Sequence, residues 1–229
     1  MGYTALYRKF RPQTFSEMVG QEHITRTLRN QIIANRVGHA YLFNGVRGTG
    51  KTTSAKVLAR AVNCLNPQDG EPCNECEICK AALDGSLTDI VEMDAASNNS
   101  VEDIRSIREE VNFLPTKAKY RVYIIDEVHM LSQGAFNALL KTLEEPPEYV
   151  VIILTTSNES KLLTTIKSRC MKLYFEPIPE KKIINYLKQN GINSDITENM
   201  LKHCEGSIGK ALKINDSKEQ YMQIEQLIG

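Results

Sequence analysis

The sequence predicts an α/β protein in which a five-stranded parallel sheet is sandwiched by helices and followed by a small all-helical domain. Short apolar runs alternate with helix-like stretches up to residue 178, as in parallel sheets covered on both faces. A glycine-rich motif follows the first apolar run. After the prolines at 177 and 179, only helical periodicity continues.

The apolar runs are expected to be buried strands, because parallel strands covered on both faces are apolar nearly throughout. They are residues 40–43, 89–93, 121–126, 150–156 and 170–175. The helix-like stretches between them are residues 51–64, 100–112, 133–144 and 160–167. We therefore expect an α/β domain over residues 1–178 and a helical domain over residues 179–229.

Composition and charge exclude several classes of protein. The chain has 28 Lys and Arg residues and 28 Asp and Glu residues, so bulk charge gives no reason to bind nucleic acid or anionic lipid over the whole surface. No apolar run has the length of a membrane span, and the first residues do not resemble a signal peptide. We expect a cytoplasmic protein that does not bind membranes.

Four of the six cysteines lie close together in the sequence. In a reducing cytoplasm this spacing favours metal binding over disulfides. Two residues between successive cysteines allow their thiolates to face one centre, and four thiolates complete the tetrahedral shell of a structural zinc. The alternative is a loop of free thiols, which would be open to oxidation. We expect a zinc module at about residues 64–80, with the ligands Cys64, Cys73, Cys76 and Cys79.

The stretch GVRGTGKT is a complete P-loop motif between a predicted strand and a predicted helix. Its glycines allow backbone N–H groups to surround phosphate oxygens, and the helix N-terminus adds positive charge. Lys51 is expected to neutralise the β- and γ-phosphates, and the Thr52 hydroxyl to bind Mg²⁺. The alternative, a glycine-rich turn that binds nothing, is disfavoured by the flanking strand and helix. The expected nucleotide-binding residues here are Gly45, Val46, Arg47, Gly48, Thr49, Gly50, Lys51, Thr52 and Thr53.

Two adjacent carboxylates follow the apolar run in VYIIDEVH. Asp126 is expected to contribute to Mg²⁺ coordination, and Glu127 to orient and activate the water that attacks the γ-phosphate. Without a metal, two carboxylates at this place would repel each other. Nucleotide hydrolysis is therefore favoured over nucleotide binding alone. His129, two residues further on, is assigned no role.

Two weaker signals lie further along the chain. The run VVIILTTSN ends with Thr155 and Thr156, either of which would reach toward the γ-phosphate. In IKSRC, Arg169 precedes the last strand, where its guanidinium can stabilise transition-state charge in a neighbouring subunit's site. Each signal is weak alone and is strengthened by its position after the two phosphate motifs.

Taken together, the motifs resemble the gamma/tau family of the bacterial DNA polymerase III clamp loader, which are AAA+ ATPases. The resemblance covers residues 1–178, and it implies a P-loop AAA+ sheet with a zinc-binding insertion and a helical lid. Its cofactors would be ATP, Mg²⁺ and structural Zn²⁺. It is carried by the P-loop, the cysteine cluster, and the segments YTALYRKFRPQTFSEMVGQEH, DAASNNSVEDIR, VYIIDEVHMLSQGAFNALLKTLEEPP and SRC.

The resemblance also implies roles for individual residues. Thr156 would be the first sensor of the γ-phosphate, and Arg169 would act in trans. A further set would lie near the adenine base: Tyr7, Arg8, Arg11, Pro12, Val19 and Gly20. In the second-sensor helix the family usually carries an arginine, where this sequence has Gly209 followed by Lys210. A shift by one residue turns a side chain by about 100° around a helix, so Lys210 is not expected to substitute.

The function implied is that of an ATPase motor subunit of the DNA polymerase III holoenzyme, which hydrolyses ATP to load the sliding clamp onto primed DNA. Its partners would be the delta and delta-prime subunits, further gamma/tau copies, the clamp, and primed template DNA, which this chain alone would bind weakly. The alternative is a non-hydrolysing assembly module of the same complex, favoured by Gly209 and by the absence of the family's collar domain before Gly229. A helicase loader would share the P-loop but not the cysteines.

Overall fold

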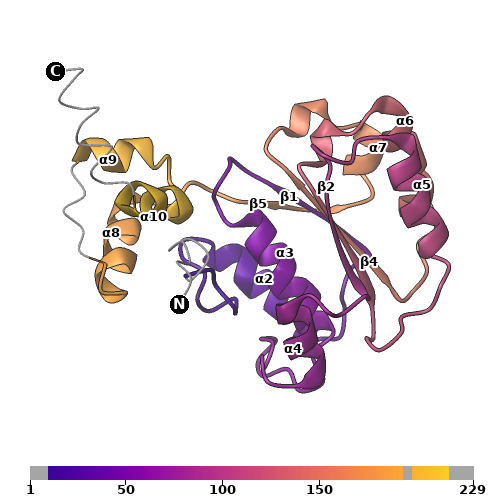
Figure 1. Cartoon of the computed structure of the whole chain (residues 1–229), viewed down its shortest axis with the longest axis horizontal. Coiled ribbons are helices and arrows are strands. Elements are labelled where there is room, and N and C mark those ends of the chain that lie inside the picture. The colour runs from indigo at the N-terminus through magenta and orange to yellow at the C-terminus, as the bar shows by residue number, and fades with distance from the viewer. Residues whose placement is uncertain (1–9, 193–197, 217–229) are drawn as a thin grey trace.

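The centre of the molecule is a parallel sheet of five strands in the order β2-β3-β4-β1-β5. The computed structural model describes residues 10–192 and 198–216 (Figure 1). The strands are β1 (Ala40–Asn44), β2 (Ile90–Asp94), β3 (Arg121–Asp126), β4 (Val150–Thr156) and β5 (Met171–Tyr174). The predicted five-stranded parallel α/β fold is confirmed.

Helices cover both faces of this sheet, as Figure 1 shows. They are α2 (Glu22–Ile33), α3 (Lys51–Val62), α4 (Glu77–Asp84), α5 (Val101–Glu110), α6 (Gln133–Glu144) and α7 (Thr164–Lys167), with 3-10 turns η1 (Val128–Met130) and η2 (Glu159–Lys161). Alternate side chains of each central strand point to opposite faces. Leu42 and Leu154 pack in the cluster with α5 and α6, whereas Phe43 and Ile153 pack in the cluster with α2 and α3.

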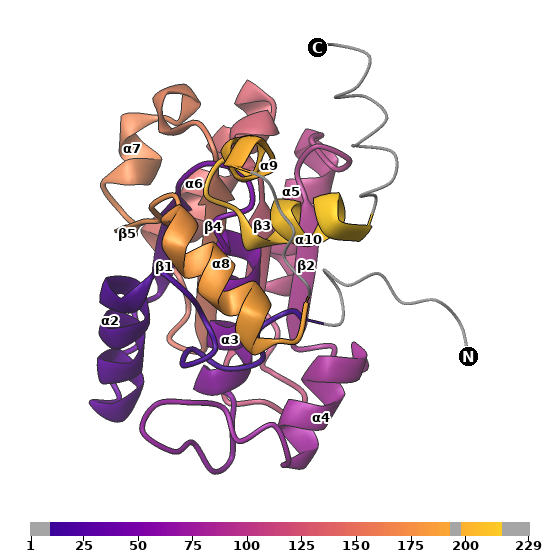
Figure 2. The ribbon, with the colours of Figure 1, turned by 90° about the vertical axis from the view of Figure 1, so that its left-hand side faces the viewer.

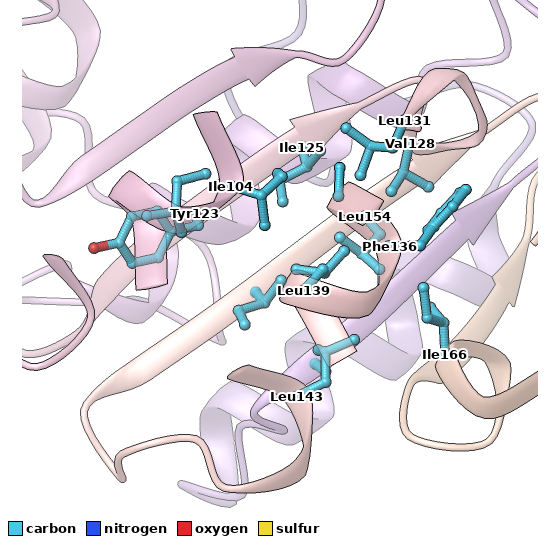
Figure 3. Packing of buried hydrophobic residues seen from close by; sticks show 14 of the residues in the cluster. Ile104, Tyr123, Ile125, Val128, Leu131, Phe136, Leu139, Leu143, Leu154 and Ile166 are labelled. Carbon is cyan, nitrogen blue, oxygen red and sulfur yellow. The ribbon is translucent and has the colours of Figure 1, made fainter. Parts of the chain in front are cut away.

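The cluster on the α5 and α6 face fixes these two helices over the central strands (Figure 3). Ile104 of α5 and Leu139 of α6 are fully buried, together with Ile125 of β3 and Leu154 of β4. Removing a side chain of this size from water contributes about 1.5–3 kcal/mol. The packed cluster therefore holds the ends of β3 and β4 in a fixed relation to the loops that follow them.

Two of the predicted buried strands, β2 and β5, are instead half-exposed. Their positions at the two edges of the sheet leave each with a single neighbouring strand. Glu92, Lys172 and Tyr174 are accordingly exposed to solvent. The prediction that all five strands are buried was wrong because a hydrophobic run does not reveal the order of strands in a sheet.

The helices differ from the predicted ones in two respects. The helix predicted over 160–167 is split into η2 and the short α7, because the backbone is extended at Leu162 and Leu163 and Leu162 turns into the core. The helices α2 and α4 have no counterpart among the predicted helices. In α2 the residues Ile24 and Leu28, four positions apart, form the buried stripe.

A separate group of helices follows the prolines: α8 (Glu180–Gln189), α9 (Glu198–His203) and α10 (Ile208–Asp216). They enclose their own buried cluster, which includes Ile183, Leu187 and Leu212. Figure 1 shows this group beyond one end of the sheet, close to the first described residues. No helix within the described ranges is long and apolar enough to cross a membrane.

The loop before β3 is held by the buried carboxylate of Asp89, which accepts hydrogen bonds from the backbone N–H groups of Thr116, Lys117 and Ala118 at 2.7, 2.8 and 2.9 Å. Burial acts to raise the pKa of Asp89, but these donors and the nearby Arg121 outweigh it and hold the pKa below its ordinary value. The ionised carboxylate therefore stabilises the folded chain.

We predict that Asp89→Ala lowers the free energy of unfolding by about 3 kcal/mol, because three backbone N–H groups lose a buried, charged acceptor. Since the folded-state pKa is lowered, this contribution is complete above the ordinary carboxyl pKa of 3.8 and is lost as the pH falls through the lower folded value. Urea unfolding at several pH values measures the difference between the variant and the wild type. A difference that stays constant well below pH 3.8 would contradict this account.

Candidate functional site

Polar residues gather where β1, β3 and β4 reach their carboxyl ends. In the register of the sheet, Asn44 lies opposite Thr156, and Asp94 lies opposite Asp126. In open parallel sheets, ligands bind in the crevice at this edge. The P-loop follows β1, so the fold brings the predicted phosphate motifs to one place.

The P-loop joins β1 to α3 through backbone conformations that require glycine. Gly50, the residue before α3, has a φ of +99°. Gly48 has a φ of +84°, and a Cβ atom there would lie 2.1 Å from the Ser207 Oγ at the start of α10. The absence of side chains thus allows both the turn and the close approach of the C-terminal helices to the loop.

Lys51, the first residue of α3, is buried at the base of the P-loop. Its Nζ donates to the carbonyl oxygens of Gly45 and Val46 at 2.7 and 3.0 Å. Burial lowers the pKa of its ammonium group, while the carboxylates of Glu127 and Asp126 act in the opposite direction. The ammonium group therefore lies between the loop backbone and two acidic residues.

Asp126, at the end of β3, connects three elements. Its carboxylate accepts from the Thr52 hydroxyl of α3 at 3.0 and 3.1 Å, and from the Thr155 hydroxyl of β4. A hydroxyl beside a carboxylate is the oxygen-ligand set that Mg²⁺ takes in phosphate sites. The two residues predicted to bind magnesium are in direct contact.

Glu127 follows β3 with a φ of +50°, in the left-handed region that is rare for side chains other than glycine. Its backbone N–H donates to the Thr155 hydroxyl at 3.1 Å. Its carboxylate accepts from the Ser157 hydroxyl at 2.9 Å and from the Arg47 Nε at 3.3 Å, and it lies 3.3 Å from the His129 Nδ1. One backbone contact and three contacts of the carboxylate thus fix where Glu127 points.

His129 belongs to this arrangement, although the sequence pattern assigned it no role. Its Nδ1 lies 3.1 Å from the Thr156 hydroxyl and close to Glu127. The side chain is 7% exposed, and burial lowers the pKa of the imidazole, against the opposing effect of the Glu127 carboxylate. Its position two residues after Glu127, inside a 3-10 turn, brings it back to the site, and sequence spacing alone does not predict that turn.

The site opens into a cavity of about 260 Å³ between the sheet edge and the C-terminal helices. Its phosphate-motif side comprises Arg47 to Thr53, Asp126 and Glu127. Sequence reasoning placed Pro12 and Val19 near the base but missed the rest of the apolar wall, which combines residues from both ends of the chain: Phe10, Met18, Ile178, Tyr186, Ile208 and Leu212. The contribution of α8 and α10 exists only in the folded chain.

The residues predicted near the adenine base divide into three groups. Arg11, Pro12 and Val19 line the cavity. Gly20, like Gly45 and Val46 of the P-loop, is not among the lining residues. Tyr7 and Arg8 lie outside the described residues.

Arg169 lies away from the cavity. Its guanidinium donates to the Glu144 carboxylate at 2.8 Å and to the Thr165 carbonyl at 2.9 Å. Its side chain is one-third exposed, so it is accessible from outside the protomer. At the second-sensor position Gly209 lines the cavity, whereas Lys210 does not line it and pairs with Glu205.

The four predicted zinc ligands converge beside α4, with all Sγ atoms within 4.8 Å of one another. The N–H groups of Cys73, Cys76 and Cys79 donate to the sulfurs of Cys64, Cys73 and Cys76 at 3.3, 3.3 and 3.4 Å. Burial acts to raise the pKa of Cys73, but N–H donors outweigh it and lower that pKa to about 6. Four converging sulfurs with N–H donors fit a tetrahedral zinc site.

A family model described as DNA polymerase III, delta subunit, matches residues 20–179. The chain belongs to this family of DNA polymerase III subunits. It is 53% identical to the tau subunit of Bacillus subtilis over 91% of this chain and 36% of that protein. It is 42% identical to the tau subunit of Escherichia coli over 94% of this chain and 34% of that protein. The chain therefore spans about a third of these relatives, and its resemblance to gamma/tau subunits is confirmed.

Solved structures agree with the fold of this DNA polymerase III subunit. A gamma-subunit-related protein of Thermotoga maritima aligns with a TM-score of 0.61 and 27% identity, over 83% of this chain and 56% of that chain. The RuvB branch migration motor of Thermotoga maritima aligns with a TM-score of 0.62 and 18% identity, over 95% of this chain and 67% of that chain. The P-loop AAA+ architecture predicted from the sequence is thereby confirmed.

For this DNA polymerase III subunit, we predict that His129 titrates below the ordinary imidazole value of 6.5, since burial disfavours its charged form. Glu127→Gln removes the carboxylate that raises the pKa, so the midpoint should fall further. Nuclear magnetic resonance of the ring C–H signals at a series of pH values measures the titration midpoint in the wild type and in Glu127→Gln, and His129→Gln assigns the signal. An upward movement in Glu127→Gln would show that the two side chains are not in contact.

Proposed function

We propose that this chain is the ATP-binding and ATP-hydrolysing part of a cytoplasmic clamp-loader subunit of DNA polymerase III. The observation that carries the proposal is the convergence of Lys51, the Thr52–Asp126 pair and Glu127 at one cavity. A P-loop, a metal-binding pair and a water-orienting carboxylate are the parts that phosphoryl transfer to water requires. In the proposal, residues 1–178 form the nucleotide-binding domain and residues 179–229 the lid.

Each side chain has a stated task in this proposal. Lys51 and the P-loop N–H groups bind the β- and γ-phosphates, and Thr52 and Asp126 hold Mg²⁺, which supplies charge neutralisation on the phosphate oxygens. Glu127 accepts a proton from the attacking water, and its contacts with Ser157 and His129 orient it. Thr156 senses the γ-phosphate, while Thr155 holds Asp126 in place.

The apolar wall of the cavity is proposed to hold the adenine base. Pro12, Val19 and Ile208 are among the residues that line the cavity on this side. Their apolar surface suits the face of a purine ring, and Arg11 adds a donor at the same wall. Because α8 and α10 contribute to the wall, base binding would link the lid to the sheet.

The four cysteines are proposed to hold a structural Zn²⁺. The observation in favour is the set of N–H groups directed at their sulfurs, which stabilise thiolates. Zinc would cross-link the loop before Cys73 to the start of α4, where no other covalent link exists among the described residues.

Assembly with other subunits is proposed for the exposed Arg169, whose guanidinium would complete a neighbouring subunit's site. The proposed neighbours are further gamma/tau copies and the delta and delta-prime subunits, and the proposed targets are the sliding clamp and primed DNA. The helix α5 begins with a Ser100–Asp103 capping box and carries four acidic and two basic side chains, so this chain alone is proposed to bind DNA weakly. The second candidate function, nucleotide binding without hydrolysis, is favoured by the missing arginine at Gly209.

We predict that Glu127→Gln binds ATP as the wild type does but hydrolyses it at least about 100-fold more slowly, because the water loses its base. Fluorescence titration with a labelled ATP analogue and a phosphate-release assay measure the two properties. Lys51→Ala serves as the contrasting variant and should lose binding itself. Wild-type binding without any turnover, in the presence of other clamp-loader subunits, would favour the second candidate function.

We predict that ATP turnover per protomer rises with protein concentration, and that Arg169→Ala abolishes this rise because it removes the trans guanidinium. Lys167→Ala, at the end of α7, is the matched control and should behave as the wild type. Nucleotide affinity of the isolated protomer should not change, since Arg169 lies outside its own cavity.

Mixing provides the decisive comparison for Arg169. Arg169→Ala retains Glu127, and Glu127→Gln retains Arg169, so mixed assemblies contain some interfaces with both groups. Activity that returns on mixing the two inactive variants supports action in trans. Activity that stays absent, while size measurements show mixed assemblies, would rule it out.

A further inference from the structure

The zinc module contacts the very segment that forms one wall of the nucleotide cavity. We call residues 10–20 the 10–20 segment. It contains no helix or strand, and Phe10, Pro12, Met18 and Val19 from it line the cavity. Figures 1 and 2 show it in indigo between the C-terminal helices and the loop that precedes α4. A segment without regular structure depends on side-chain contacts for its position.

Glu71, in the loop between the first two zinc-ligand cysteines, supplies the main contact. Its carboxylate accepts from the N–H of Phe15 at 2.6 Å and from the N–H of Ser16 at 2.9 Å. The side chain is 14% exposed, and Arg29 of α2 lies 3.5 Å from it. Hydrogen bonds from N–H groups to a charged, largely buried carboxylate are among the stronger ones in proteins.

Two further side chains from the same side hold Gln13. The Asn74 amide donates to the Gln13 carbonyl at 3.3 Å. The buried guanidinium of Arg60 donates to the same carbonyl and to the Gln13 Oε1 at 3.2 Å. The 10–20 segment is therefore fixed at residues 13, 15 and 16, midway between the cavity residues Pro12 and Met18.

The contacting residues flank the zinc ligands directly. Glu71 lies two positions before Cys73, and Asn74 lies one position after it. Arg29 also holds the loop, because its Nε donates to the Asp69 carbonyl at 2.8 Å. A metal that fixes Cys73 relative to Cys64 would fix Glu71 between them.

We propose that the zinc module sets nucleotide affinity, with Glu71 as the positioning residue that carries its effect to the wall of the cavity. When Glu71 holds Phe15 and Ser16, the apolar wall is formed before nucleotide arrives. When the contact is lost, only a fraction of the molecules has the wall in place, and the apparent dissociation constant rises by the inverse of that fraction. The proposal rests on the nucleotide-binding function proposed above.

The test measures binding of a fluorescent ATP analogue with Mg²⁺ to this chain as wild type and as Glu71→Ala. Glu75→Ala is the matched control, because Glu75 is an exposed carboxylate of the same zinc module, four positions after Glu71, and makes none of the contacts to Gln13, Phe15 or Ser16 described above. Bound zinc is measured by atomic absorption for each protein. Each is then assayed again after zinc removal by a chelator that is dialysed away before Mg²⁺ is added.

We expect Glu71→Ala to raise the dissociation constant about fivefold to tenfold while retaining zinc, and Glu75→Ala to leave it unchanged. Zinc removal should weaken binding by the wild type to a similar extent, and should weaken binding by Glu71→Ala by less than about twofold, because the two changes act through one contact. Unchanged affinity in zinc-loaded Glu71→Ala would overturn the proposal. Zinc removal that weakens nucleotide binding equally in the wild type and in Glu71→Ala would also overturn the proposal.

Two controls distinguish a failure of this proposal from a folding defect of the variant and from a failure of the proposed nucleotide-binding function. If Glu71→Ala does not fold, as judged by circular dichroism, Asn74→Ala carries the test, because it removes a single neutral hydrogen bond and should raise the dissociation constant about twofold. A wild type that does not bind the analogue at all would instead refute the proposed nucleotide-binding function.

Discussion

The arrangement of the site depends on the Asp126 carboxylate. It ends β3, accepts from Thr52 at the start of α3, and accepts from Thr155 at the end of β4. These contacts join the P-loop helix to two neighbouring strands across the edge of the sheet. A half-buried carboxylate is stabilised by hydrogen-bond donors or by a cation, so the same carboxylate that joins these elements also suits a metal ion.

The strained backbone at Glu127 follows from the same geometry. Immediately after β3, the chain must turn so that the side chain of Glu127 faces the site rather than the core. The left-handed conformation costs of order 1 kcal/mol or more, and the hydrogen bond from its N–H to Thr155 offsets part of that cost. Ser157, Arg47 and His129 then converge on the carboxylate, so three contacts from residues outside β3 set the position of this side chain.

The other wall of the cavity has a different physical character. It is built from a segment without regular structure and from the separate C-terminal helices, and the hydrogen bond from Ile178 N–H to the Gly206 carbonyl ties the connecting residues to those helices. Gln21 strengthens the same junction, since its amide donates to the Glu176 carbonyl at 2.7 Å and accepts from the Glu176 N–H at 3.2 Å. The cavity thus lies between the P-loop and an apolar wall that side-chain contacts hold in place.

Sequence patterns alone predicted the parallel α/β class, the strand positions to within one residue, and the local groups that chemistry requires. These features depend on short-range rules: apolar runs form strands, glycines permit the P-loop turn, and closely spaced cysteines share a centre. Family membership likewise follows from contiguous motifs, because residues near one another in sequence keep their spacing in any fold.

Three features were visible only in the folded chain. They are the strands that lie at the edges of the sheet, the contacts of His129 with Glu127 and Thr156, and the apolar cavity wall that Phe10 and Ile208 form together. Strand order was not predicted, because β2 and β5 differ from the central strands by only one charged residue inside each strand, Glu92 and Lys172, and one charge in a short apolar run does not identify an edge strand. The helix predicted over 160–167 failed because Leu162 is buried by packing against the core rather than by helical periodicity. Most of the deciding interactions join residues far apart in the chain, such as His129 with Thr156, and the free energy of such contacts depends on the completed packing rather than on local sequence.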